Sequence, residues 1–144
     1  MKIKEGGEKT IITLEKAKQA LEASEAKAKE LGITVSTAIV DDYGVLIAIS
    51  KMDGALHISP KYAFAKAYTA ANLCFPTGDL EQYAGEGKPY FGFNTLFGGE
   101  LTAIAGGLPT KMHGKVIGAV GVGGSADVSQ DVQCSQEAVK ILEG

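Results

Sequence analysis

Arginine is absent from the sequence: all 14 basic residues are lysines, and the formal net charge is −3. Arginine supplies the planar, bidentate donors that favour recognition of phosphates and base edges. Without these donors, and with nearly balanced charge, a nucleic-acid partner is not expected.

Cysteine and long apolar runs are also scarce. Cys74 and Cys134 show no CxxC or other metal-ligand spacing, which suits two reduced, mostly buried thiols and predicts no structural metal. No run approaches the roughly 18 apolar residues of a membrane span, and the first residues lack the apolar core of a signal peptide. We therefore expect a cytoplasmic protein with no membrane partner.

The length and the glycine content indicate how the chain is organised. At 144 residues, the chain is expected to form one domain, residues 1–144, without an internal repeat or a linker. Most of its 19 glycines follow residue 84, so the second half should be rich in turns and close backbone contacts.

The segment from Lys51 to Pro76 is predicted to be the centre of the fold. Ser59 suits a helix N-cap and Pro60 the first helical position, so the pattern predicts a helix from Pro60 to Asn72. At about 100° per residue, one face is mostly alanine, which predicts close packing against a sheet. This face contains Ala63, Phe64, Ala67, Tyr68, Ala70 and Ala71. The opposite face is expected to contain Lys61, Lys66, Thr69 and Asn72.

The remaining segments predict two more helices and two antiparallel pairs of strands. Thr13 and Gly32 should bound the first helix, and Asp127, with Gln130 three residues on, should cap the last. The expected strands are 34–40 with 45–49 and 101–105 with 116–122. Strands joined as hairpins favour an α+β fold with an antiparallel sheet covered by helices.

The glycine-rich loop at 121–125 precedes the last helix. Backbone N–H groups and the helix dipole at such a place favour an anion, so Gly123 and Gly124 are candidate ligand contacts. The loop lacks the P-loop and dinucleotide-binding spacings, so a tight structural turn is the competing interpretation. Asp131, near the start of the last helix, is explained equally well by local capping and by a function.

The sequence contains two histidines as candidate ligands. His113 precedes Gly114 between two predicted strands, where a turn with positive φ is expected. His57 lies in the loop before the central helix, where an imidazole can reach a ligand. We therefore choose His57 as the candidate metal ligand.

Several motifs resemble the HbpS/GlcG family, which includes the C-terminal domain of PduO-type cobalamin adenosyltransferases and is often labelled haem-degrading. The resemblance covers about residues 11–141. The matching segments are Thr-Leu-Glu-Lys-Ala at 13–17, Val-Asp-Asp-Tyr-Gly at 40–44, Lys-Met-Asp-Gly at 51–54, Lys-Ala-Tyr-Thr-Ala-Ala at 66–71, Gly-Gly-Leu-Pro at 106–109 and Gly-Lys-Val-Ile-Gly-Ala-Val-Gly-Val at 114–122. Lys51 departs from the arginine that is common before Met-Asp-Gly in the family.

The resemblance implies a profilin-like, three-layer arrangement, in which helices cover both faces of a five-stranded antiparallel sheet, and assembly into homo-oligomers. It also implies haem or a corrinoid-type tetrapyrrole as a ligand of some members. The first functional hypothesis is therefore a cytoplasmic tetrapyrrole-binding protein, accessory to diol, glycerol or glycolate use. One alternative is an enzyme or accessory factor acting on a small hydroxy acid or diol-derived metabolite. Another is a non-catalytic structural oligomer.

The ligand pocket is expected between the stretch from Met52 to Tyr68 and the glycine-rich loops. The candidate contacts are Lys51, Met52, Asp53, His57, Tyr68, Gly123 and Gly124.

Overall fold

The computed structural model describes residues 11–144. Its elements, in chain order, are α1 (Leu14–Leu31), β1 (Ser36–Asp41), β2 (Leu46–Lys51), α2 (Ser59–Leu73), η1 (Thr77–Leu80), α3 (Glu81–Ala84), η2 (Phe93–Gly98), β3 (Gly107–Met112), β4 (Lys115–Gly123) and α4 (Val128–Glu143). None of the helices in this part of the chain is long and apolar enough to cross a membrane.

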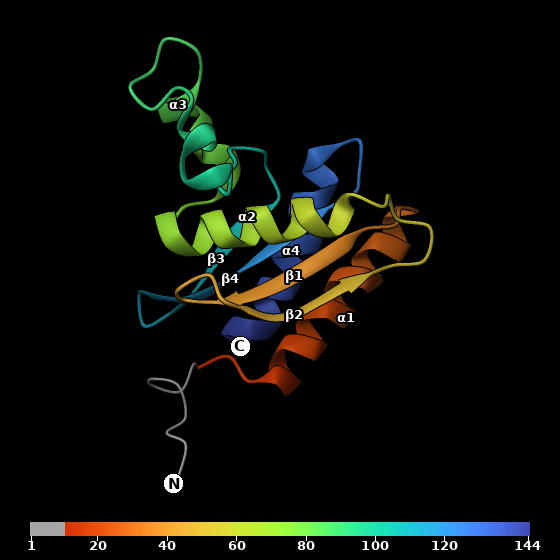
Figure 1. Cartoon of the computed structure of the whole chain (residues 1–144). Coiled ribbons are helices and arrows are strands. Elements are labelled where there is room, and N and C mark those ends of the chain that lie inside the picture. The colour runs from red at the N-terminus through yellow and green to blue at the C-terminus, as the bar shows by residue number, and fades with distance from the viewer. Residues whose placement is uncertain (1–10) are drawn as a thin grey trace, which may run out of the picture.

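The strands form one antiparallel sheet in the order β2-β1-β4-β3. Figure 1 shows α2 on one face of this sheet and α1 with α4 on the other. The expected α+β fold with three layers is therefore confirmed. The expected fifth strand is not present between residues 11 and 144, so the sheet there has four strands instead of five.

The second pair of strands differs from the prediction. Residues 101–105 are irregular, and the segment expected to connect two strands is itself the strand β3. β3 contains Pro109 and lies at the edge of the sheet, where a missing N–H can be tolerated. The irregular segment is held by side chains: Thr69 Oγ1 accepts a hydrogen bond from the N–H of Thr102.

The two helices on the far face begin as the sequence predicts. Thr13 caps α1 by accepting a hydrogen bond from the N–H of Lys16, and Gly32 ends this helix in the left-handed conformation. Asp127 caps α4 by accepting from the N–H of Ser129. These local signals therefore fixed both helices correctly.

The start of α2 is one residue earlier than expected. Ser59 is already helical, and Ile58 occupies the cap position without a side-chain hydrogen bond. The Ser59 hydroxyl instead donates to the carbonyl of Leu56 and lies 2.8 Å from the hydroxyl of Ser36. The prediction of Ser59 as the N-cap was therefore wrong, because this hydroxyl joins the loop before α2 to β1.

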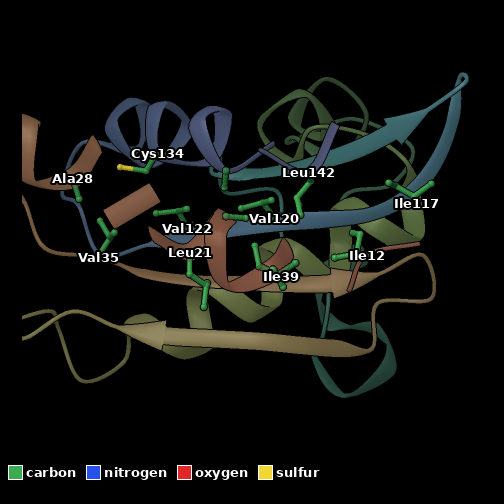
Figure 2. Packing of buried hydrophobic residues seen from close by; sticks show 13 residues of the cluster. Ile12, Leu21, Ala28, Val35, Ile39, Ile117, Val120, Val122, Cys134 and Leu142 are labelled. Atoms are coloured by element: carbon green, nitrogen blue, oxygen red, sulfur yellow. The ribbon is translucent and has the colours of Figure 1, made fainter. Parts of the chain in front are cut away.

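Two apolar clusters hold the layers together. The larger cluster lies between the sheet and the helices α1 and α4, and Figure 2 shows labelled members such as Leu21, Ile39 and Val120. The second cluster joins α2 to the other face and consists mainly of alanine. A Cβ atom at Gly121 would overlap backbone atoms of α2. The predicted close packing of the alanine face is confirmed.

A lobe, defined here as residues 73–101, joins α2 to the sheet region and extends away from the sheet (Figure 1). An apolar pocket of about 500 Å³ lies in this lobe. Its aromatic lining residues are Phe75, Tyr83, Tyr90, Phe93 and Phe97. Cys74, at the start of the lobe, is an exposed thiol, whereas Cys134 is buried in the larger cluster, so the expectation of two buried thiols was wrong for Cys74.

Candidate functional site

A cleft of about 280 Å³ lies beside the N-terminal half of α2. One wall comes from α2, which begins with Ser59, and from Leu56 in the loop before it, and the other comes from Gly124 and Ser125 before α4. The sequence predicted a pocket between these two segments of the chain. The structure places them together because α2 packs on β4, whose C-terminal end leads into the loop before α4.

The floor of the cleft contains a buried ion pair. Lys66 Nζ lies 3.2 Å from Asp131 Oδ2, and the two side chains are 2% and 1% exposed. Lys66 also donates to the carbonyl of Val122 at 2.8 Å, and Asp131 Oδ1 accepts from the N–H of Ser125 at 3.1 Å. Helical periodicity placed Lys66 on the face of α2 opposite the alanines. That prediction was wrong because the lysine head finds a carboxylate partner beneath the helix.

Burial controls the ionisation of both groups. Loss of hydration lowers the pKa of Lys66 and is opposed by the neighbouring carboxylate of Asp131. Loss of hydration also raises the pKa of Asp131, against the effects of Lys66 and the Ser125 N–H. The two shifts bring the proton affinities of amine and carboxylate closer together, which favours exchange of a proton between them.

A carboxylate of the protein itself, from Asp131 in α4, occupies the hydrogen-bond donor of the glycine-rich loop. Asp131 accepts the N–H of Ser125, so this donor is not free for an external anion. The Ser125 hydroxyl donates to the side chain of Gln130, which therefore does not complete the expected capping box. Gly123 is a packing residue, since a Cβ there would lie 2.7 Å from the Cβ of Tyr62. These contacts favour the structural-turn interpretation of the loop.

The rim of the cleft is apolar and accessible. Leu56, Tyr62, Ile104 and Val128 line the cleft and are 62%, 45%, 43% and 41% exposed. The four side chains come from the loop before α2, from α2, from the irregular segment before β3 and from the first turn of α4. Apolar side chains gathered in this way typically mark a binding surface.

The two histidines occupy different places. His57 is exposed and stands between Leu56, on the rim, and the loop residues that lead into α2. His113 lies in the turn between β3 and β4 with φ of 53°, followed by Gly114 with φ of 76°. The predicted turn role of His113 is confirmed. His57 follows the rim residue Leu56 in the chain but is not among the residues that line the cleft.

The other candidate contacts are distributed around the molecule. Lys51 is exposed at the end of β2, and Asp53 is exposed in the turn that follows. The Met52 sulfur accepts a hydrogen bond from the N–H of Val35 at 3.4 Å and packs against the larger cluster. The Tyr68 ring packs close to Gly44, and a hydrogen bond with Glu100 raises the pKa of its hydroxyl.

Of the seven candidate contacts predicted from the sequence, only Gly124 is among the residues that line the cleft. The ion pair was missed as a unit, although a lysine in an alanine-rich helix and an aspartate on an otherwise apolar helix face were both visible in the sequence. Among residues 11–144, no group of three or more histidine, cysteine, aspartate or glutamate side chains is placed to hold a metal ion.

The fold and the cleft can now be compared with known proteins. A family model described as haem-degrading protein, HbpS-like, matches residues 12–140. The chain belongs to the HbpS-like family. An uncharacterised 15.0 kDa protein from the dhaT-dhaS intergenic region of Citrobacter freundii is 36% identical over 128 residues, which are 89% of each chain.

Solved structures of HbpS-like proteins share this architecture. The Klebsiella pneumoniae protein ORFY superimposes with a TM-score of 0.88 and 30% identity, covering 98% of this chain and 97% of that one. A structure described as a PduOC:haem complex gives a TM-score of 0.84 at 28% identity, covering 88% and 91%. The family assignment made from the sequence motifs is thereby confirmed.

Proposed function

We propose that this HbpS-like protein is a cytoplasmic protein that binds haem or a related tetrapyrrole at the cleft, with His57 as the axial nitrogen ligand. The observation that carries the proposal is the accessible apolar rim of the cleft, and the exposed His57 follows the rim residue Leu56 in the chain. The similarity to a protein whose structure is described as a haem complex supports the ligand class.

The chemistry of the rim suits a flat macrocycle. A tetrapyrrole is a wide apolar ring with polar edges, and Leu56, Tyr62, Ile104 and Val128 offer it an apolar surface. The cleft, at about 280 Å³, is slightly smaller than the range of about 300–1,000 Å³ that is usual for enclosed ligand pockets. The cleft would therefore receive one edge of the ring, while the rim supports one of its faces.

The propionates at the polar edge of a haem need a cation, and the lysine of the cleft does not supply it. Lys66 is held by Asp131 and by a carbonyl, so it is not available to a propionate. Lys51 is exposed at the end of β2, in the stretch that leads to His57, and we propose it as the contact for a propionate. As a lysine it would act as a point charge rather than a planar fork.

We also propose that copies of the chain associate through the lobe. Tyr90, Phe91 and Phe97 are 65%, 66% and 71% exposed on it. Surfaces with several large exposed apolar side chains usually contact a partner. The glycine-dense segment 85–107, which includes much of the lobe, permits close approach of a second backbone.

Haemin titration followed by absorbance tests the ligand and its axial donor. The wild-type chain is expected to give a saturable Soret band. His57→Ala should shift this band and weaken binding by about tenfold or more, which corresponds to at least about 1.4 kcal/mol. The thermal transition of the apo protein should stay nearly unchanged, because an exposed loop side chain contributes little packing.

His113→Asn is the matched control, because asparagine accepts the positive φ of the turn and should leave haemin binding unchanged. A parallel titration with cobalamin tests whether the chain binds a corrinoid instead of haem. A silent His57→Ala with an essential His113 would place the ligand at the β3–β4 turn and refute the site. Absence of any saturable Soret band would refute haem binding.

A further inference from the structure

The buried ion pair on the floor of the cleft has no part in the haem proposal. Replacing buried ion pairs by apolar side chains is often neutral or stabilising, so the stability of the fold does not account for this one. Lys66 and Asp131 both line the cleft, and an open cavity therefore reaches an amine and a carboxylate that are otherwise withdrawn from water.

The surrounding backbone leaves space for the amine. A Cβ at Gly106 would lie 2.6 Å from the Val122 carbonyl oxygen and 2.9 Å from Lys66 Nζ, so a larger residue there would crowd both the lysine head and the carbonyl to which it donates. A Cβ at the next residue, Gly107, would overlap the backbone oxygen of Lys66. The lysine therefore occupies a shaped position in which its Nζ is fixed by Val122 and Asp131.

We propose that the Lys66 amine forms an imine with a small aldehyde that enters the cleft, and that Asp131 carries the proton for this reaction. This inference goes beyond tetrapyrrole binding and does not depend on it. An amine removed from water next to a proton acceptor is the usual arrangement of a nucleophilic lysine.

The step balances without an oxidant or a cofactor. Asp131 takes a proton from the Lys66 ammonium, and the neutral amine attacks the carbonyl carbon to form a carbinolamine. Asp131 then returns a proton to the carbinolamine hydroxyl, which leaves as water as the C=N bond forms. The products are the iminium of Lys66 and one water molecule, and hydrolysis reverses the reaction.

The surroundings of the pair define the class of aldehyde. A substrate carboxylate would meet Asp131 across the same floor, so an uncharged aldehyde is favoured. Leu56, Ile104 and Val128 surround the entrance, which suits a short alkyl chain. The volume of about 280 Å³ accommodates a molecule of a few carbon atoms.

Reductive trapping tests the proposal on the haem-free chain. The protein is treated with limiting acetaldehyde and sodium cyanoborohydride at pH 7, and ethylated lysines are quantified by peptide mass spectrometry. Lys61 is the internal reference, because it is exposed on the same helix. Lys66 should be labelled faster than Lys61, because burial lowers the pKa of the Lys66 amine and so raises its neutral fraction.

The same reaction in urea should label the two lysines at similar rates, which shows that the preference comes from the folded cleft. Asp131→Asn keeps an acceptor for Ser125 but removes the group that carries the proton. It should slow labelling of Lys66, although loss of the carboxylate lowers the pKa of the amine further, and it should leave Lys61 unchanged. Lys66 labelling that is absent or no faster than Lys61 in the folded wild-type chain refutes the proposal. Unchanged or faster labelling in folded Asp131→Asn refutes the role of Asp131. Haemin is absent from this assay, so its outcome is separate from the haem titration.

Discussion

Replacing Lys66 by methionine removes the cation of the buried pair while keeping most of the side-chain volume. Asp131 is then left 1% exposed without its partner. Breaking a buried pair from one side costs about 3–5 kcal/mol. We expect about 3 kcal/mol for Lys66→Met, because Asp131 keeps the Ser125 N–H and its raised pKa allows it to take up a proton.

The double variant Lys66→Met/Asp131→Asn removes both charges and should recover most of this loss. The asparagine oxygen can still accept from Ser125, and the remaining cost is chiefly the lysine hydrogen bond to Val122, about 1 kcal/mol. We therefore expect the double variant to unfold within about 1 kcal/mol of the wild type.

Urea unfolding at pH 7, followed by far-ultraviolet circular dichroism, measures both differences. The dependence of the unfolding free energy on urea should be the same in all three proteins, so that midpoints report stability alone. If the double variant is destabilised by about 3 kcal/mol or more, the pair contributes net stability. The argument that stability does not explain the pair would then fail.

Three further predictions concern the ion pair, the packing of Gly121 and the lobe. Burial raises the pKa of Asp131 above 3.8 and lowers the pKa of Lys66 below 10.5. Relative to the double variant, the wild type should therefore lose unfolding free energy as the pH rises from 3.8 through the folded pKa of Asp131, and regain it between the folded pKa of Lys66 and 10.5. A difference in unfolding free energy that stays constant across pH in urea titrations contradicts this. Gly121→Ala should lower the free energy of unfolding in urea by about 3 kcal/mol or more, because its Cβ would overlap the α2 backbone. Gly114→Asn, in an open turn, should lower it by less than about 1 kcal/mol, and equal losses in the two variants would refute the close packing. Phe97→Asp should dissociate the proposed oligomer at micromolar concentration in light scattering, and a monomeric wild type would refute the interface.

The sequence predicted those parts of the fold that depend on local signals. The caps Thr13 and Asp127 and the alanine face of α2 all lie where the pattern placed them, because each depends on neighbours within a few residues. The strand β3 was missed because Pro109 is unfavourable in most strands, and only the sheet order shows that it lies at an edge.

The candidate site was predicted only in outline. The cleft lies between two of the segments that the sequence nominated, since the loop before α2 and the glycine-rich loop both line it. The ion pair was not predicted, because Lys66 and Asp131 are 65 residues apart and helical periodicity treats a lysine as a surface residue. That the aliphatic stem of Lys66 is buried and that Asp131 is its partner can be seen only when α2 and α4 are placed together.

Haemin titration of two charge variants tests the proposed location of the ligand most directly. Leu56 is on the rim of the cleft and Leu96 lines the pocket of the lobe, and the two side chains are similarly exposed, at 62% and 52%. Both Leu56→Asp and Leu96→Asp should therefore leave the apo protein folded, with stability changed by about 0.5 kcal/mol or less. The account predicts that Leu56→Asp weakens haemin binding by about tenfold or more and that Leu96→Asp leaves the dissociation constant unchanged. Full binding by Leu56→Asp together with loss of binding by Leu96→Asp would place the ligand in the lobe and contradict the account.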